Sequence, residues 1–507
     1  MRWAALVAAT LALLALRIYA AQRIGFGDSE ALYACYARHP QPVYLDHPGL
    51  IGVLARALGG GDAPSPFAAH LGTALLSTIA PWMGALAARA AGASWTGSAI
   101  AAGALMLAPE ISVGLFGLTP DLLLIVCWYA AVLFAALAMK AEPGSARSLL
   151  LGLASGFAAG LSCDAKVSGV LLVAGLGLAW ASPAARMHRS TLTPWAGLVV
   201  ALVVFSPVVF DEIERAFPML RHRLVETQKG AGPSLRNLAV LAGGQLLYVT
   251  PPLLWAAVRV ARDLYDRRRE DVVSALLWSV TIAALPLVLL ACLSPVAEPH
   301  WIAPLYLALP LHFARGWDAA ARAQATAPLV SPITRGLAVG VGIASIATAH
   351  AWVLLPLAPR LLGARYEPRY DLANDLYAWR TGLPMLRRAF AQSVDLDGPP
   401  PIVVGPHWTV CAQVHAALPA SILVGCEGDI PDDFSRWLPR STWEQAPVVL
   451  YVTDDRFGDP VKALARRRLD AAWKVDVERG GVPVRRISVS RLVVSASASV
   501  TAPPIRQ

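Results

Sequence analysis

Charged, aromatic and cysteine residues are all scarce in this sequence of 507 residues. Only 15% of the residues are Asp, Glu, Lys or Arg and 8% are aromatic, whereas 56% are hydrophobic and the mean hydropathy is +0.52. About a quarter of a typical soluble chain is charged, so this composition excludes a wholly soluble protein. The six cysteines show no C-x-x-C spacing, which indicates neither a zinc site nor a thioredoxin-like motif. No internal repeat is evident, and we expect no nucleic-acid partner.

Apolar runs dominate the first 357 residues, and each is long enough, or nearly so, for a membrane helix of about 17–25 residues. We place eleven of them near 5–22, 67–90, 96–117, 121–139, 148–163, 167–182, 195–211, 237–258, 273–293, 302–314 and 336–357. The first run also has the features of a signal peptide cleaved after Ala21. We interpret it as an uncleaved span.

Basic residues in the short connections predict a cytoplasmic N-terminus. Arg89, Lys140 and Arg186 lie in connections that would then face inward, whereas the connections at 119–121 and 294–300 hold no Lys or Arg. The stretch 211–236 breaks this pattern, because it would face outward and yet carries several cations, among them Arg221. Such a loop is compatible with binding an anionic lipid phosphate.

Eleven spans would place everything after Pro356 outside the cytoplasm, and the sequence changes character there. Helical spacing over 366–392 is followed by short β-rich runs at 402–404, 422–424 and 448–452, and by a hairpin over 474–489. Helices are expected near 408–417 and 459–470. We predict an extracytoplasmic α/β domain over 358–495 and a disordered tail over 496–507. Its two cysteines, Cys411 and Cys426, would meet an oxidising compartment, so we expect a disulfide between them.

Ionisable residues gather in the predicted first outer loop, residues 25–65, which follows the first span at once. Asp28, Glu30, Arg38, His39, Asp46 and His47 lie within this loop. Carboxylates and imidazoles are costly at membrane depth unless they are paired or hydrated, so this cluster is a candidate functional site. An ordinary polar loop is the alternative. Helical spacing over 29–38 and 50–58 predicts two short helices that frame the cluster.

The order of residues in this loop resembles that of a known family. Asp28-Ser29-Glu30-Ala31-Leu32-Tyr33 and Tyr44-Leu45-Asp46-His47-Pro48 are similar to the D-E-A-x-Y and Y-x-D-H-P-P-L motifs of polyprenyl-phosphate-sugar-dependent glycosyltransferases with the GT-C fold. These are the protein O-mannosyltransferase and lipid A aminoarabinose transferase type, glycosyltransferase family 39 and its relatives. Glu30 falls on the family's Glu, Asp28 is displaced by one residue, and Gly49 replaces the second Pro. Which carboxylate is catalytic therefore stays open.

Further landmarks of this family occur in the expected order along the chain. They are Thr119-Pro120-Asp121, Asp164-Ala165-Lys166, Gly243-Gly244-Gln245, Glu298-Pro299-His300-Trp301, the segment 371–379 and Phe434-Ser435-Arg436-Trp437. Together they cover most of the sequence. The resemblance implies a polytopic α-helical GT-C protein with about 11 transmembrane helices in residues 1–357 and a C-terminal α/β domain.

The polar landmarks of the helical part all fall at the outer ends of the predicted spans, so we expect them to line one outward-facing cavity. Tyr33, Tyr44, Asp46, Asp121, Asp164, Gln245 and His300 are the predicted substrate-binding residues, and His47, Lys166 and Arg221 the predicted donor-phosphate ligands. A lysine inside an apolar run suggests contact with an anion. The alternatives are that Lys166 reaches to the interface, that Asp121 caps a helix and that His300 is an interfacial residue.

The resemblance implies an inverting glycosyltransferase at the outer face of the bacterial cytoplasmic membrane. It would move a sugar from a polyprenyl-phosphate donor, an undecaprenyl lipid in a bacterium, to a hydroxyl of a lipid, glycan or protein. By family analogy Asp28 is the general base, with Glu30 as alternative or partner. No cofactor is required by the motifs, although Asp28, Glu30, Asp46 and His47 are candidate ligands for a divalent cation. A transporter or flippase of a lipid-linked substrate is the alternative function, but ionisable residues in transporters usually lie near the membrane midplane.

Overall fold

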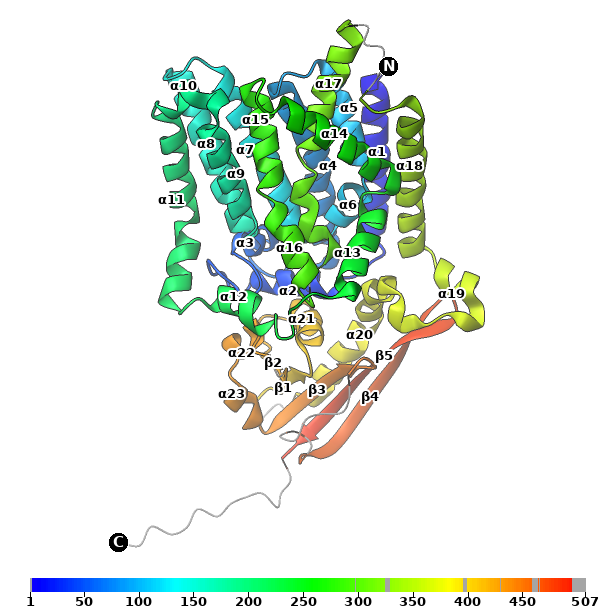
Figure 1. Ribbon diagram of the computed structural model, residues 1–507. Helices are drawn as coiled ribbons and strands as arrows, with labels where there is room; N and C mark the ends of the chain where they lie inside the picture. Colours follow the sequence, from blue (N-terminus) through cyan, green and yellow to red (C-terminus); the bar gives the residue numbers. More distant parts are fainter. Residues whose placement is uncertain are drawn as a thin grey trace, which may run out of the picture. The chain divides into compact units, whose positions relative to one another are not determined.

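The computed structural model describes residues 2–296, 298–323, 329–394, 399–428, 430–457, 464 and 466–494 (Figure 1). It contains two compact units. A helical unit comprises Met1–Ala20, Pro40–Leu54 and Ala69–Ala351, and a second unit comprises Ala21–His39, Ala55–Ala68 and Trp352–Gln507. The first outer loop thus contributes to both units, so its two family motifs are described separately below.

Helices make up almost all the regular structure of the helical unit. Those that lie wholly or mostly in it are α1 (Arg2–Ala21), α3 (Leu50–Leu58), α4 (Pro66–Ala90), α5 (Trp95–Met106), α6 (Pro109–Ser112), η1 (Gly114–Phe116), α7 (Pro120–Lys140), α8 (Ala146–Ala165), α9 (Gly169–Ala181), η2 (Pro183–Ala185), α10 (Arg186–Arg189), α11 (Thr193–Glu214), α12 (Pro218–Arg221), the π-helical turn η3 (His222–Glu226), α13 (Leu235–Tyr248), α14 (Pro251–Arg267), α15 (Val272–Ile282), α16 (Leu285–Leu293), η4 (Pro299–Leu305), α17 (Leu309–Ala323) and α18 (Pro332–Leu354).

Among the described residues, seven to ten helices or helix pairs could cross a membrane, and together they cover ten of the eleven predicted spans. Seven are continuous, and three more are pairs of helices bent by more than 40° at a short break, namely α5 with α6 and η1, α9 with η2 and α10, and α13 with α14. The prediction of a polytopic helical protein is confirmed. Residues 302–314 do not form the predicted eleventh span, because they are divided between η4 and α17. Pro304 and Pro310 lack the N–H groups that a continuous helix would need there.

A buried arginine stabilises one of the three breaks. Arg17 of α1 donates from Nη2 to the carbonyls of Ile111 and Ser112, at 3.1 and 2.9 Å, where α6 ends. Carbonyls released by a bend inside a membrane helix need such donors, because no water replaces them. Arg17, which is almost completely buried, therefore has a structural role.

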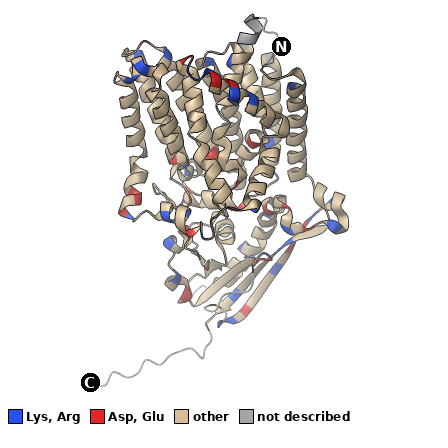
Figure 2. Ribbon diagram, viewed as in Figure 1, with Lys and Arg blue, Asp and Glu red and all other residues tan. Residues whose placement is uncertain are grey.

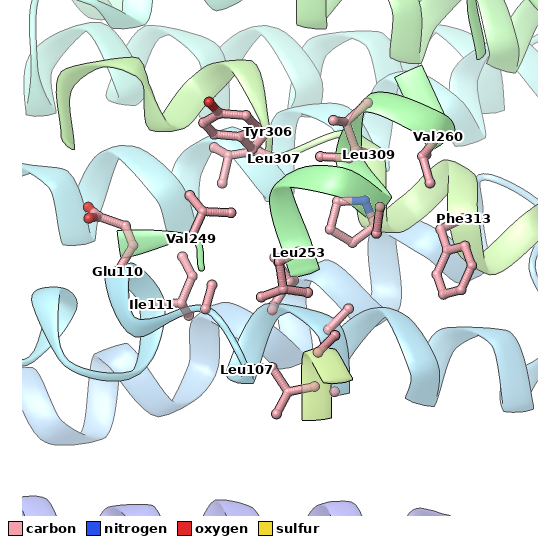
Figure 3. A pocket seen from close by; sticks show the side chains of 18 of the residues that line it. Leu107, Glu110, Ile111, Val249, Leu253, Val260, Tyr306, Leu307, Leu309 and Phe313 are labelled. Carbon is pink, nitrogen blue, oxygen red and sulfur yellow. The ribbon is translucent and has the colours of Figure 1, made fainter. Parts of the chain in front are cut away.

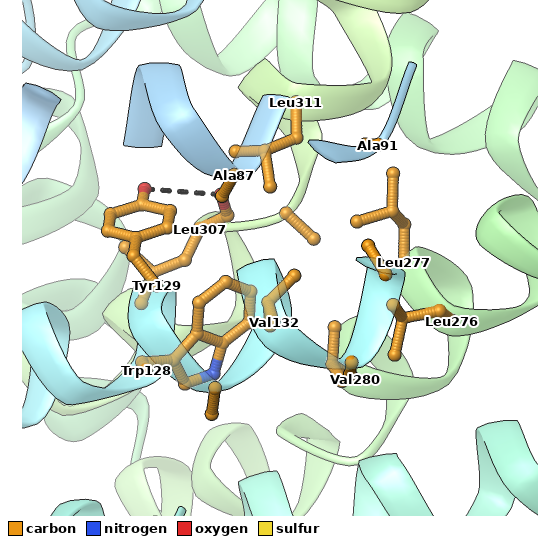
Figure 4. Packing of buried hydrophobic residues seen from close by; sticks show 14 of the residues in the cluster. Ala87, Ala91, Trp128, Tyr129, Val132, Leu276, Leu277, Val280, Leu307 and Leu311 are labelled. Carbon is orange, nitrogen blue, oxygen red and sulfur yellow. Dashed lines mark hydrogen bonds between the residues drawn. The ribbon is translucent and has the colours of Figure 1, made fainter. Parts of the chain in front are cut away.

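Close packing of small and aromatic side chains holds the bundle together. Trp128 and Tyr129 of α7 lie in its main apolar cluster, and the Tyr129 hydroxyl donates to the Leu307 carbonyl at 3.2 Å (Figure 4). Helices α8 and α11 pack backbone to backbone, since a Cβ added at Gly156 would lie 2.0 Å from the carbonyl oxygen of Gly197. Small residues at helix crossings are typical of membrane bundles.

Charged side chains are unevenly distributed along the helices of the helical unit. Lys, Arg, Asp and Glu collect near the ends of the helices, and the middle parts of the helices are mostly uncharged (Figure 2). This distribution is the one expected for helices whose middle parts face lipid or other apolar helices.

A mixed five-stranded sheet forms the centre of the second unit. Its elements are α2 (Asp28–Tyr36), α19 (Leu357–Leu362), η5 (Gly363–Arg365), η6 (Pro368–Tyr370), η7 (Leu372–Asn374), α20 (Asp375–Ser393), β1 (Ile402–Gly405), α21 (Trp408–Ala417), β2 (Val424–Cys426), α22 (Asp433–Trp437), α23 (Arg440–Glu444), β3 (Val448–Asp454), β4 (Arg468–Arg479) and β5 (Val482–Val493). The strand order is β2-β1-β3-β5-β4. Strands β2, β1 and β3 are parallel, while β5 pairs antiparallel with both β3 and β4.

The sheet confirms the α/β prediction in most details. The hairpin turns at Gly480 and Gly481, whose φ angles of +64° and +80° suit the tight turn that glycine pairs favour. Helix 408–417 is confirmed as α21, and strand 422–424 is shifted to Val424–Cys426. The predicted helix over 366–392 begins only at Asp375, because the carboxylate of Asp371 accepts the N–H of Ala373 and starts a separate 3-10 turn.

Three further predictions concern the end of the chain. Cys411 and Cys426 are both buried and both free thiols, so the predicted disulfide is wrong. Buried cysteines of this kind pack as small apolar side chains. Most of the predicted helix 459–470 and all of the predicted tail lie outside the described residues, and 468–470 belong to β4.

Candidate active site

Asp28 and Glu30 lie in the first turn of α2, in the second unit. Glu30 Oε2 accepts the backbone N–H of Gly27 at 2.8 Å, which satisfies one of the free donors at this helix end. The side chain of Glu30 is buried, and so is Tyr33 one turn later. Glu30 therefore stabilises the start of the helix that carries Asp28.

Asp28 keeps a more accessible position at the same helix end. Its carboxylate is 18% exposed, and Oδ2 accepts a hydrogen bond of 2.6 Å from Nη1 of Arg456. The second oxygen, Oδ1, is buried and has no hydrogen-bond partner among the described residues. A carboxylate with one oxygen held and the other unpaired can accept a proton from a reacting hydroxyl.

The second motif of the loop, residues 44–48, forms a tight turn in the helical unit. The N–H of Tyr44 donates to the carbonyl of His47 at 2.9 Å, and the N–H of Gly49 donates to that of Pro42 at 2.7 Å. A Cβ at position 49 would lie 2.5 Å from the Gln41 carbonyl oxygen. Glycine therefore suits this position, where the family motif has a proline without an N–H.

This turn presents Asp46 and His47 to Arg223 of the π-helical turn η3. Arg223 Nη2 lies 3.2 Å from Nε2 of His47 and 3.4 Å from Oδ1 of Asp46, and its Nε donates to the Asp46 carbonyl at 3.0 Å. Burial lowers the pKa of His47 well below its usual value, and the charges of Arg223 and Lys166 act in the same direction. His47 is therefore a neutral partner that orients Arg223, and the cation beside it is the arginine.

A second group of charges joins three landmarks of the helical unit. Lys166, the residue at which α8 ends, donates from Nζ to both carboxylate oxygens of Asp121 at 2.8 and 3.0 Å. His300 Nε2 lies 3.5 Å from Asp121, and its Nδ1 lies 3.1 Å from Glu298. Burial alone would lower the pKa of His300, but the charge of Asp121 and the hydrogen bonds to Asp121 and Glu298 outweigh it and raise the pKa to about 9. The imidazole is therefore a cation at neutral pH.

The glycine landmark positions this group from the neighbouring helix. Gln245 of α13 donates to the Pro299 carbonyl at 2.7 Å, and a Cβ at Gly244 would lie 2.2 Å from the side chain of Pro299. Helix α13 therefore fixes the segment from Glu298 to His300. The sequence predicted both landmarks but not this contact.

Two predicted residues lie apart from these groups. Arg221 is exposed on α12, two residues before Arg223. Asp164 precedes Lys166 by two residues in the last turn of α8, but its carboxylate forms no ion pair with any residue that the structure describes. The short helix turns at 218–226 rotate position 223, and not position 221, toward the Asp46 turn.

An apolar cavity of about 420 Å³ adjoins the His300 group (Figure 3). Leu107, Ile111, Val249, Leu253 and Phe313 are among the side chains that line it. Its few polar lining residues include Glu110, Gln245 and His300. The cavity is thus apolar along most of its wall, and the cations that line it are His300 and Arg335.

The structure adds residues that the sequence analysis missed. Arg223, Glu298 and Arg456 each contact a predicted site residue. Glu298 was quoted with its landmark and Arg223 lies in the basic stretch 211–236, so both had a sequence signal. Arg456 had none, because it lies in the C-terminal domain, far from Asp28 along the chain.

The described residues show no group of three or more His, Cys, Asp or Glu side chains placed to hold a metal ion. Glu30, one of the four candidate ligands, is instead engaged with the backbone at the start of α2, and Asp46 and His47 contact Arg223.

Comparison with known proteins gives a family match over part of the chain and a fold over nearly all of it. Residues 57–210 match the dolichyl-phosphate-mannose-protein mannosyltransferase family. This segment includes the Asp121 and Lys166 landmarks. No curated protein sequence matches the chain.

Solved structures match over almost the whole length. ArnT from Cupriavidus metallidurans bound to undecaprenyl phosphate is 18% identical, with a TM-score of 0.58 over 96% of this chain and 97% of ArnT. The apo form of the same protein gives 17% and 0.59, over 97% of this chain and 98% of ArnT. Archaeal oligosaccharyltransferase AglB from Archaeoglobus fulgidus, in complex with an inhibitory peptide and a dolichol-phosphate, is 12% identical with a TM-score of 0.52, over 89% of this chain and 69% of AglB. These likenesses show that the chain has the same fold.

Proposed function

We propose that the chain is a membrane glycosyltransferase that transfers the sugar of a polyprenyl-phosphate donor to a hydroxyl group. The match of residues 57–210 to the dolichyl-phosphate-mannose-protein mannosyltransferase family and the fold shared with ArnT support this proposal. The acceptor is a lipid, glycan or protein at the outer face of the bacterial cytoplasmic membrane, and the anomeric centre is inverted. An apolar cavity that meets His300, which contacts the buried ion pair of Asp121 and Lys166, carries this proposal.

The cavity suits the prenyl chain of the donor. Its lining side chains would remove isoprene units from water, and each buried methylene contributes about 0.8 kcal/mol. Two structures with the same fold contain such lipids: ArnT is bound to undecaprenyl phosphate, and AglB is in complex with a dolichol-phosphate. These ligands consist of a long apolar chain and a phosphate, the two chemistries found side by side here.

The donor phosphate would bind at Lys166, His300 and Arg223. Each of these cations is oriented in advance by a neighbouring carboxylate or by the Asp46 turn. Preorganised cations stabilise the negative charge that develops on a leaving phosphate without further reorganisation. The groups that bind the donor would thus also stabilise the departing polyprenyl phosphate.

Asp28 would act as the general base. The acceptor hydroxyl attacks the anomeric carbon, its proton passes to the Asp28 carboxylate, and the bond between the anomeric carbon and the phosphate oxygen breaks. Polyprenyl phosphate leaves with the bonding electron pair, and a single displacement of this kind inverts the anomeric centre. Glu30 supports the reaction by stabilising the start of α2.

Undecaprenyl phosphate is the first probe for this proposal. We expect the protein in nanodiscs to bind it, and mass spectrometry of the purified protein to find a polyprenyl-phosphate sugar as co-purifying lipid. Leu253→Trp would fill part of the cavity. This variant should lose about tenfold or more in affinity for undecaprenyl phosphate, the equivalent of about one apolar side chain's burial.

Two controls make the test specific. Leu178→Trp, at an exposed position of α9, should keep wild-type affinity, and a short-chain prenyl phosphate should be affected less by Leu253→Trp than the long one. Absence of both binding and a co-purifying prenyl lipid would refute the proposed donor.

A further inference from the structure

Six charged side chains meet around the start of α2 in the second unit. They come from four segments: Asp28 of α2, Asp375 of α20, Asp454 with Asp455 and Arg456 at the end of β3, and Arg485 of β5. The sheet and α20 therefore bring charges to the residue proposed as the base. Every contact in this group lies within the second unit.

Arg456 occupies the centre of the group. Its Nε and Nη2 donate to the carboxylate of Asp454 at 2.8–3.1 Å, and its backbone N–H donates to Asp454 Oδ1 at 3.0 Å. Its remaining terminal nitrogen, Nη1, lies 2.6 Å from Asp28 Oδ2 and 3.6 Å from Asp375 Oδ1. Because the guanidinium is planar and rigid, a bidentate contact with Asp454 determines where Nη1 points.

The carboxylates of the group outnumber its cations. Arg485 forms ion pairs with Asp375 at 2.5 Å and with Asp455 at 3.4 Å. The group therefore holds four carboxylates and only two guanidinium groups, those of Arg456 and Arg485. Burial and the negative charge of Asp28 raise the pKa of Asp375, against the opposing effect of Arg456 and Arg485. Asp28 therefore depends on Arg456 as its ion-pair partner in a strongly negative surrounding.

The contact also determines how Asp28 is held. One carboxylate oxygen is held by Arg456, whereas Oδ1 is buried and no residue that the structure describes donates a hydrogen bond to it. An unsatisfied buried oxygen costs about 1–3 kcal/mol, so such an atom is rare in a native structure unless it has a function. The contact with Arg456 therefore fixes one oxygen of Asp28 and leaves the other for a ligand's hydroxyl.

We infer that Arg456 of the C-terminal α/β domain is a positioning residue for sugar transfer, which holds the Asp28 carboxylate in the orientation that accepts the acceptor's proton. This inference rests on the proposed function, in which Asp28 is the base. It gives the C-terminal domain a part in the reaction, because Arg456 in the turn after β3 orients Asp28 in the first outer loop.

Transfer kinetics of Arg456→Gln test the inference. We expect kcat to fall about 10–100-fold, the range for losing a hydrogen bond to a charged group, with the affinity for undecaprenyl phosphate unchanged. Arg456→Lys keeps the positive charge but loses the bidentate contact of the guanidinium group with Asp454. Its kcat should therefore lie between those of Arg456→Gln and the wild type. A residue with a merely structural role would not produce this separation of kcat from donor affinity.

Two more variants guard against loss of folding. Arg456→Gln leaves Asp454 as a buried, unpaired charge, which is destabilising, so it is compared with the double variant Asp454→Asn with Arg456→Gln. Both should show the same fall in kcat, while thermal unfolding of the double variant should resemble that of the wild type. Arg486→Gln removes an exposed arginine of β5 that pairs with Asp476. This control variant should keep the kcat and the thermal unfolding of the wild type.

The outcomes separate this inference from the function on which it rests. Full kcat in the double variant, or a fall that only follows the folded fraction, overturns the role of Arg456 while Asp28→Asn remains inactive. Full activity of Asp28→Asn would instead overturn the proposed base, and with it the role of Arg456.

Discussion

The two charged groups of this protein differ in balance and in surroundings. In the helical unit, the cations Lys166, Arg223 and His300 face the carboxylates of Asp121, Asp46 and Glu298, and an apolar cavity adjoins them. In the second unit, four carboxylates share two guanidinium groups around Asp28. A balanced set of ion pairs can exchange a carboxylate for a phosphate at little cost, whereas an acid-rich set favours taking up a proton.

This difference matches the two halves of a glycosyl transfer. Departure of a lipid phosphate needs cations, and attack by a hydroxyl needs a carboxylate. The family motifs do not divide in this way along the sequence, because residues 28–33 and 44–48 belong to one loop and yet to different units. The comparison therefore predicts two kinds of effect. Substitutions in the group of the helical unit should change donor binding, and substitutions in the group around Asp28 should change the rate of transfer.

Asp28→Asn should have the largest effect. The amide cannot take the proton of the acceptor, so we expect kcat to fall about 10²–10⁴-fold with donor affinity unchanged. Transfer from a polyprenyl-phosphate sugar, measured beside a binding titration with undecaprenyl phosphate, checks both statements.

Glu30→Gln is the matched control for this change. The amide oxygen can still accept the Gly27 N–H, so the loss should be far smaller than for Asp28→Asn. A reversed order of the two variants would make Glu30 the base, and equal, full activity would remove this loop from the chemistry.

Lys166→Ala should weaken binding of the donor more than binding of the acceptor. It removes a charge-assisted contact with the phosphate, worth about 10–100-fold in donor affinity, and it leaves Asp121 without its closest partner. Lys166→Arg should retain most of the affinity. Lys140→Ala, at the far end of α7 where the amine donates to the Ala90 carbonyl, should not change it, and unaltered donor binding in Lys166→Ala would exclude a phosphate ligand at this position.

The smallest expected effect is a pH dependence of donor affinity that comes from His300. Its pKa is raised to about 9, so the imidazolium is present below that pH and is lost as pH rises through it. A phosphate monoester is already ionised in this range, so affinity for undecaprenyl phosphate should fall, by about tenfold, between pH 7.5 and 9.5. His300→Gln should bind more weakly at pH 7.5 and show a flatter profile, whereas an unchanged profile in this variant would assign the titration elsewhere.

Local chemistry made much of the fold predictable. Apolar runs of membrane length predicted the seven to ten candidate spans among the described residues. Runs rich in β-forming residues predicted three strands, and Gly480-Gly481 predicted the hairpin between β4 and β5. Spacing over 50–58 and 408–417 likewise predicted α3 and α21. Each of these depends on hydrophobic periodicity or turn geometry within a short window, which a single sequence displays.

The landmarks of the candidate site were also visible, since ionisable residues in an apolar chain stand out. Asp121, Lys166 and His300 meet in the structure, as expected from their positions at the outer ends of the predicted spans. Their partners were less predictable. The sequence favoured Arg221 over Arg223 because both lie in one basic stretch, and only the turns at α12 and η3 bring Arg223 to the Asp46 turn.

What the sequence by itself determined is therefore the class of protein, most of its helices and strands, and the polar residues that carry the chemistry. Tertiary structure alone decided the pairings: Cys411 and Cys426 remain thiols, and Arg456 reaches Asp28 across more than four hundred residues of sequence. The physical reason is that periodicity and turn propensity act over a few residues, whereas an ion pair depends on where distant segments pack.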